Sequence, residues 1–128
     1  MDVVIKYVEG SRDDLESAAV LLAGGKPFHI PFLCHQALFK LLRGLYLETK
    51  NSYPPFETHL PTLLRKTGRQ NLIDSDGLEF LHELSFYPEV VGHSVYRQKI
   101  IERGNRAGEY LDRARRMADS LIESIERS

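Results

Sequence analysis

Apolar residues recur every three or four positions along most of this chain, and no stretch alternates convincingly between apolar and polar side chains. This spacing collects apolar side chains on one face of a helix, whereas a half-buried strand needs a period of two. The pattern predicts helices over about residues 2–23, 30–50, 59–67 and 75–87, and a final helix that ends near residue 126. The spacing therefore predicts an all-α fold.

Loop and cap residues set the expected limits of these helices. Residues 51–57 form the clearest loop, because two prolines in NSYPPFE bar a helix and Asn and Ser favour turns. Thr58 is the expected N-cap of the third helix. Gly10 lies inside the first helix and costs about 1 kcal/mol relative to alanine. The first helix could therefore start late instead, with Ser11 as its N-cap.

A chain of 128 residues is long enough to bury one core, and it shows no internal repeat, low-complexity tract or linker. We therefore expect a single domain over residues 1–128. Several principal helices joined mostly by short loops predict an antiparallel up-and-down four-helix bundle with a short additional helix. The residues expected to face the core from the fourth and final helices are Leu78, Leu81, Leu84, Leu111, Ala114, Ala118, Leu121, Ile122 and Ile125.

The net charge and the cysteine content restrict the partners and the cellular compartment that we expect for this protein. The formal net charge is −1, so any binding to nucleic acid or to an anionic surface needs a local patch. The single cysteine, Cys34, cannot form an internal disulfide and fits a reducing cytoplasm. The N-terminal stretch lacks the plan of a signal peptide, and no apolar run approaches the ~20 residues of a membrane span. We expect a cytoplasmic protein with no membrane partner.

The stretch LCHQALFKLLR, residues 33–43, places four polar residues in an apolar run. At 100° per residue, His35 falls within the wide apolar arc, which predicts a structural histidine with one or two hydrogen bonds. Gln36, Lys40 and Arg43 instead share one narrow line, which we call the polar seam. The polar seam is either a solvated edge of a central helix or a groove that binds phosphate groups or the acidic residues of a partner.

The histidines give no pattern that favours a metal. Glu79-Phe-Leu-His82 matches half of the paired Glu-x-x-His motif of di-metal bundles, but no other glutamate is followed three places later by histidine. No nucleophile–histidine spacing and no Gly-rich phosphate loop is present. We therefore expect no metal, no cofactor and no catalytic residue.

Acidic and basic residues are unevenly distributed along the sequence. Acids dominate the first helix, whereas bases dominate two later stretches, where the basic residues are Arg65, Lys66 and Arg69, and then Arg97, Lys99, Arg103, Arg106, Arg113, Arg115 and Arg116. A solvated mixed-charge face explains such a pattern, and a phosphate-tracking patch with salt-sensitive binding is the alternative.

Short motifs spread over nearly the whole chain together resemble the HEPN domain (higher eukaryotes and prokaryotes nucleotide-binding). The segments that carry the resemblance are Asp14-Leu15 with Ala18, His35–Arg43, Pro55 with Thr58-His59-Leu60, and Phe86-Tyr87. The chain departs from the family pattern at Phe39, where glutamate is usual, and at Arg43, where lysine is usual. Leu60-Pro61 replaces the aspartate that usually follows Thr-His. The Ala-Arg-Tyr-Pro segment is eroded to Val91–Val95.

The resemblance also bears on catalysis. Ribonuclease members of the wider HEPN group carry an arginine followed, after four to six residues, by a histidine. No arginine lies five to seven positions before any histidine of this chain, at 29, 35, 59, 82 or 93. The resemblance therefore implies a non-catalytic module rather than a HEPN ribonuclease.

The resemblance implies that the domain forms a homodimer, binds nucleotide or RNA, and pairs with a separately encoded minimal nucleotidyltransferase, in a two-part, toxin–antitoxin-like arrangement. The expected ligand-binding residues are Gln36, Lys40, Arg43, His59, Arg97 and Arg103. The four basic residues would contact phosphate, and Gln36 and His59 would orient the ligand through hydrogen bonds. The alternative is a homodimeric assembly domain without a nucleotide ligand, in which the polar seam and the long final helix form the dimer face. Tyr96, Tyr110 and nearby arginines would suit this interface if they are exposed.

Overall fold

A computed structural model describes residues 2–86 and 106–127. Every regular element in these two ranges is helical, which confirms the all-α prediction. The elements are α1 (Asp2–Ala23), η1 (Pro27–His29), α2 (Ile30–Lys50), α3 (Leu60–Thr67), η2 (Gln70–Leu72), α4 (Ser75–Leu84) and α7 (Ala107–Glu126). The predicted features between residues 87 and 105 lie outside the described residues. Within the described ranges, no helix is long and apolar enough to cross a membrane.

The predicted bounds of the first two long helices are confirmed. The late start at Ser11 is wrong, because Ser11 lies inside α1 and its hydroxyl donates a hydrogen bond to the carbonyl of Val8 at 2.6 Å. A serine that bonds back to its own helix in this way needs no cap position.

The starts of the two short helices differ from the prediction in one case. Thr58 is not the N-cap of α3, because His59 occupies that position and makes no side-chain capping bond. The predicted start of α4 at residue 75 is confirmed, and Asp74 is its N-cap, since its carboxylate accepts a hydrogen bond from the backbone N–H of Gly77 at 2.8 Å. At the far end of α3, Gly68 has φ of 74°, a left-handed conformation that glycine adopts without strain.

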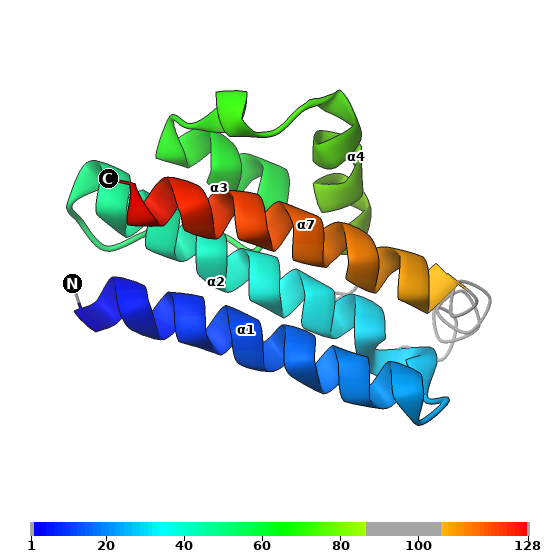
Figure 1. Cartoon of the computed structure of the whole chain (residues 1–128). Coiled ribbons are helices and arrows are strands. Elements are labelled where there is room, and N and C mark those ends of the chain that lie inside the picture. The colour runs from blue at the N-terminus through cyan, green and yellow to red at the C-terminus, as the bar shows by residue number, and fades with distance from the viewer. Residues whose placement is uncertain (1, 87–105, 128) are drawn as a thin grey trace.

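Three long helices dominate the arrangement (Figure 1). α1 runs antiparallel to α2 and α7, so the N-terminal end of α1 and the C-terminal end of α7 lie at the same end of the molecule. α2 packs against α1, α7, α3 and α4. It is therefore the central helix, as its wide apolar arc predicts.

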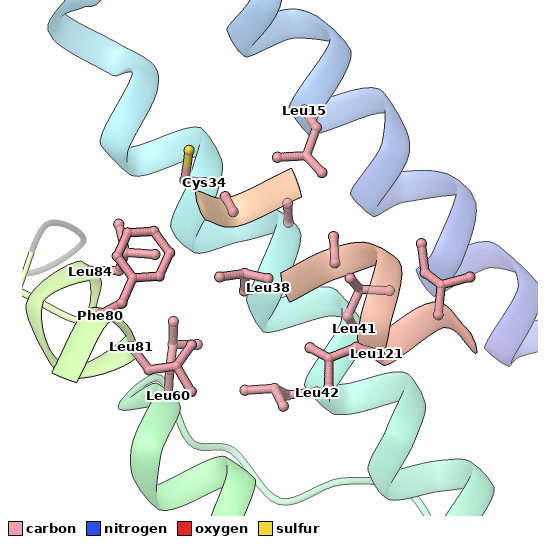
Figure 2. Close-up of a cluster of buried hydrophobic side chains, with 14 of the residues drawn as sticks. Leu15, Cys34, Leu38, Leu41, Leu42, Leu60, Phe80, Leu81, Leu84 and Leu121 are labelled. Carbon is pink, nitrogen blue, oxygen red and sulfur yellow. The ribbon is translucent and has the colours of Figure 1, made fainter. Parts of the chain in front are cut away.

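Leucines that α2 shares with its neighbours form most of the core (Figure 2). Leu38, Leu41, Leu42 and Leu45 are fully buried on α2. Leu60, Leu81 and Leu84 from the short helices and Leu121 from α7 close around them. All six predicted core residues of the final helix are buried, so its apolar stripe is confirmed.

One prediction about a side-chain environment is wrong, that for Leu78, and the exposure on which an interface role of Tyr110 depended is not found. Leu78 was expected in the core but is 44% exposed, and Phe80 is buried in the core instead. Tyr110 was considered for an exposed dimer face, yet it is 2% exposed, packs near the ring of Phe80 and donates a hydrogen bond to Glu83. Tyr96 lies outside the described residues. Tyr110 therefore belongs to the packing between α4 and α7 and not to an interface.

Two glycines allow α1 and α2 to pack closely. A Cβ atom at Gly44 would lie 3.3 Å from the Cβ of Tyr7, and a Cβ at Gly10 would lie 3.1 Å from the Cδ of Lys40. Gly10, which looks unfavourable in a helix interior, thus gives the side chain of Lys40 room to cross α1.

Two leucines on the same helix test the assignment of the core. We expect Leu81→Ala to lower the free energy of unfolding by about 2–5 kcal/mol, because it leaves a cavity in the core. Leu78→Ala, the matched control on the exposed side, should cost less than about 1 kcal/mol. Urea denaturation followed by circular dichroism measures both. Equal losses for the two variants would contradict this account of α4.

Candidate functional site

The polar seam does not form one continuous site, because Lys40 turns toward α1. Its ammonium group lies 2.8 Å from the carboxylate of Asp14, and the pair is largely shielded, with side-chain exposures of 34% and 17%. Lys40 thus ties α2 to α1 across Gly10. As a phosphate ligand it would first have to leave this carboxylate.

Arg43 lies at the junction of α1, α2 and the loop of residues 51–59. Its Nε donates to the hydroxyl of Tyr7 at 3.3 Å, and one Nη donates to the carbonyl of Pro55 at 3.4 Å. The guanidinium carbon lies 5.8 Å from the ring centre of Tyr7 and 5.4 Å from that of Phe39. Two aromatic faces and two hydrogen bonds therefore fix a half-exposed cation, and a guanidinium keeps further N–H donors for a ligand.

Gln36 lies beside His35. The Nδ1 of His35 is 3.1 Å from the side-chain amide of Gln36, and its Nε2 is 3.1 Å from the carbonyl of Thr58. Burial lowers the pKa of His35 below its ordinary 6.5, against the opposing effect of these two hydrogen bonds, so the ring is neutral at pH 7. A carbonyl oxygen only accepts, so Nε2 of the neutral ring carries the proton and donates it to Thr58. The prediction that His35 is structural is confirmed by its 1% exposure.

The loop of residues 51–59 presents two aromatic rings to solvent. Tyr53 is 74% exposed and Phe56 is 93% exposed. The loop is nevertheless fixed, because Pro54 is buried and Arg43 and His35 hold the carbonyls of Pro55 and Thr58. Exposed aromatic rings on a fixed loop are typical of surfaces that bind a partner or stack on a base.

His59 is the last predicted ligand-binding residue within the described ranges. Its Nδ1 lies 2.7 Å from the hydroxyl of Thr62, and its Nε2 lies 3.3 Å from Nδ1 of His82 on α4. Its backbone N–H, and then Lys66, lower the pKa of the Glu57 carboxyl below its ordinary value. His59 is therefore held on three sides, at the start of α3.

The structure brings together some of the predicted residues and separates others. Arg43 contacts the loop of residues 51–59, His59 belongs to it, and Gln36 is linked to it only through His35, whereas Lys40 pairs with Asp14 on α1. Arg97 and Arg103 lie outside the described residues. The sequence did not indicate Tyr7, Tyr53 or Phe56, and it singled out Asp14 only in the family resemblance and His82 only in the Glu-x-x-His half-motif. Tyr7, Asp14 and His82 meet their partners through contacts between distant segments, which local spacing does not encode.

Cys34 has no place in this site. It is fully buried among leucines (Figure 2), and burial raises the pKa of its thiol to about 12. A thiolate nucleophile is therefore not formed near neutral pH. Among residues 2–86 and 106–127, no group of three or more histidine, cysteine, aspartate or glutamate side chains could hold a metal ion.

Two hollows in the surface lie away from the polar seam. One of about 390 Å³ lies between α4 and α7, where Arg113 stacks over Phe80 at 4.5 Å and donates to the carbonyl of Asp76. The other, of about 450 Å³, lies between α1 and the end of α7. None of Gln36, Lys40, Arg43 and His59, the predicted ligand-binding residues that the structure describes, lines either one.

The sequence matches the HEPN domain over residues 6–117. The chain belongs to the HEPN family. No curated protein and no solved structure matches it. The match covers most of α1, the elements from η1 to α4 and the first half of α7. It includes the polar seam, the loop of residues 51–59 and both histidines of the His59–His82 contact. HEPN domains form a nucleotide-binding and ribonuclease-type fold family. Nucleotide binding and RNA cleavage are therefore the two candidate activities for this site.

The neutral, buried His35 has a consequence for the pH dependence of stability. Because its pKa is lowered on folding, the unfolded chain binds more protons, and stability falls as the pH drops below about 6.5. We expect His35→Gln to flatten this part of the profile, measured as the free energy of unfolding in urea at several pH values. His29→Gln, which changes an exposed ring, should keep the slope of the original protein.

Parallel profiles for the protein and its His35→Gln variant would contradict this assignment. Glu57 does not obscure the result, because its pKa is lowered from 4.5 and its contribution is lost only at lower pH.

Proposed function

We propose that this HEPN domain is a non-catalytic module that binds a nucleotide or a nucleic acid along Arg43 and the neighbouring loop. In this proposal the domain works with a separately encoded minimal nucleotidyltransferase and supplies the substrate-binding half of a two-part enzyme. Gln36, Arg43 and His59 form the centre of the binding site. Lys40, Arg97 and Arg103 are additional phosphate contacts in the proposal.

The observation that carries this proposal is the environment of Arg43. A guanidinium held by Tyr7, Phe39 and the Pro55 carbonyl is preorganised, so binding an anion costs little further side-chain entropy. Arginine also matches phosphate oxygens with paired N–H donors. Both properties favour a phosphate-containing ligand at a half-exposed position.

The exposed rings of Tyr53 and Phe56 support the same proposal. They belong to the loop whose Pro55 carbonyl contacts Arg43, so a cation and two stacking surfaces lie on connected structure. Base–aromatic stacking contributes about 1–3 kcal/mol per base and tolerates any sequence. A ligand that combines phosphates with bases uses both.

A non-catalytic role is supported by the absence of the Arg-x4–6-His spacing from the sequence. The partners seen in the described ranges agree with this: His59 contacts Thr62 and His82, while Arg43 contacts Tyr7 and Pro55. An RNA digest with the purified protein should therefore show no cleavage above buffer. Degradation that survives further purification would overturn the non-catalytic part of the proposal.

Binding at Arg43 is tested with a fluorescein-labelled single-stranded RNA and with ATP, by fluorescence anisotropy and calorimetry. We expect Arg43→Ala to weaken binding about tenfold or more, equivalent to about 1.4 kcal/mol. Arg43→Lys keeps the charge but loses planar stacking and paired donors, so its affinity should be intermediate. Arg127→Ala is the matched control, because it removes an exposed arginine that pairs with Glu123 at the end of α7.

Unchanged affinity in the Arg43→Ala variant, with a native circular dichroism spectrum, would show that this residue does not bind the ligand. Binding that weakens equally in Arg43→Ala and Arg127→Ala would indicate only a general effect of net charge.

The surface of α2 favours a second candidate, a homodimeric assembly domain without a nucleotide ligand. Half-buried residues follow each other at spacings of four and three along one side of this helix: Phe32, Gln36, Phe39, Arg43 and Tyr46. That spacing is typical of a seam between packed helices. Light scattering at low and high salt separates the two candidates. A dimer that persists at high salt without ligand favours assembly, and salt-sensitive RNA binding favours the first proposal.

We also infer that the fold is completed as the antiparallel up-and-down four-helix bundle that the sequence predicts, with α4 as the fourth helix and α3 as the short additional one. The contacts of α4 with both α2 and α7 support this inference.

A further inference from the structure

The contact between His59 and His82 suggests a chemistry that the proposed function does not use. Two histidines, 23 residues apart in sequence, direct ring nitrogens at each other across the gap between the start of α3 and α4. The rings are nearly perpendicular, at 86°, with centroids 5.3 Å apart. His82 is exposed and His59 is half-buried, so solvent and ions reach the pair.

We propose that His59 and His82 form a two-ligand site for a late first-row divalent metal ion such as Cu²⁺ or Zn²⁺. The ion would lie between Nε2 of His59 and Nδ1 of His82, with water in the remaining positions. This inference goes beyond the proposed function, because it requires neither nucleotide nor RNA.

The separation of the two nitrogens fits such an ion. Zn–N bonds of about 2.0–2.1 Å at a tetrahedral angle place two ligand nitrogens about 3.3 Å apart. Nε2 of His59 and Nδ1 of His82 are 3.3 Å apart. Both nitrogens can bind one ion when His82 carries its proton on Nε2, in place of donating from Nδ1 to His59.

Thr62 supplies the support that histidine ligands usually have. Its hydroxyl lies 2.7 Å from Nδ1 of His59 and can accept the N–H of that nitrogen. This bond leaves a lone pair on Nε2, on the side of His82. A ligating histidine almost always donates its other N–H to an acceptor in this way, and the bond fixes both the tautomer and the ring orientation.

The charges near the pair define the kind of ion. Imidazole nitrogens suit copper, nickel and zinc, whereas Mg²⁺ and Ca²⁺ prefer oxygen ligands. Glu57 and Lys66 neutralise each other beside His59, so no net positive charge from this pair repels the ion. No third histidine, cysteine, aspartate or glutamate completes the site within the described ranges. The affinity should therefore follow the order of imidazole complexes, with Cu²⁺ bound more tightly than Zn²⁺.

An ion at this position would join the start of α3 to α4. The segment between the two histidines includes α3, η2 and most of α4. A ligand that binds the folded state and not the unfolded chain raises the free energy of unfolding in proportion to the logarithm of its concentration. The melting temperature should therefore rise with added Zn²⁺.

The test uses the full chain without an affinity tag, titrated with Cu²⁺ and Zn²⁺ by calorimetry, with electron paramagnetic resonance for Cu²⁺. We expect one ion per chain and a Cu²⁺ spectrum with nitrogen coupling. His82→Ala and His59→Ala should each weaken binding about tenfold or more and abolish the rise in melting temperature. Mg²⁺ should have no effect.

Two control variants separate this pair from other ligands. His29→Ala removes an exposed histidine elsewhere, and Glu79→Gln removes an exposed carboxylate one turn before His82 on α4. Both should bind Cu²⁺ and Zn²⁺ as the original protein does. A loss of binding in Glu79→Gln would overturn the two-ligand site in favour of a different ligand set.

Binding that survives His82→Ala, or the absence of heat and of any melting shift with both ions, would leave the pair as a hydrogen bond only. Modification by diethyl pyrocarbonate, read by mass spectrometry, gives an answer without any mutation. Zn²⁺ should protect His59 and His82 in the original protein and leave the modification of His29 unchanged, and equal modification with and without Zn²⁺ would overturn the proposal.

Discussion

The burial of α2 on nearly every side is the constraint on which the rest of the structure depends. Four helices pack against it, and four of its leucines, Leu38, Leu41, Leu42 and Leu45, are fully buried. A polar side chain on such a helix either finds an internal partner or reaches an edge, because an unpaired buried polar group is costly. Lys40 forms an ion pair with Asp14, Gln36 contacts His35, and Arg43 hydrogen-bonds Tyr7 and the loop of residues 51–59. The polar seam is divided because each of its members satisfies this requirement separately.

The helices themselves were predictable, because helical spacing and helix-ending residues act locally. The limits of α1 and α2 follow from apolar periodicity and from Gly24-Gly25 and the loop of residues 51–57. The errors concern side chains whose burial depends on a neighbouring helix. Spacing alone placed Leu78 in the core, but α7 packs against the side of α4 that carries Phe80. Tyr110 is buried for the same reason, since its ring packs near Phe80 and its hydroxyl reaches Glu83.

For the candidate site, the sequence predicted where the residues lie on α2 but not which partners their side chains contact. Helical geometry put Gln36, Lys40 and Arg43 on one line, and the structure keeps them there. The position of a Cβ atom does not fix where a long side chain ends, however. Lys40 crosses Gly10 to reach α1, and Arg43 meets Tyr7, 36 residues earlier in the chain. These destinations depend on the packing of α1 against α2, which no local pattern reveals.

The loop of residues 51–59 then determines what chemistry is available. It is held by Arg43 at Pro55 and by His35 at Thr58, and it ends at His59. A ribonuclease of this family needs an arginine beside a histidine. In this chain the arginine that contacts the loop, Arg43 on α2, is framed by aromatic rings, and the histidine at the end of the loop is paired with a second histidine. Arg43 contacts the loop at Pro55 and is paired with aromatic rings, whereas His59 lies at the end of the loop and is paired with His82. This division supports anion binding at Arg43 and metal binding at the His59–His82 pair. Since His59 takes part in both proposals, Arg43→Ala and His82→Ala are the variants that separate them.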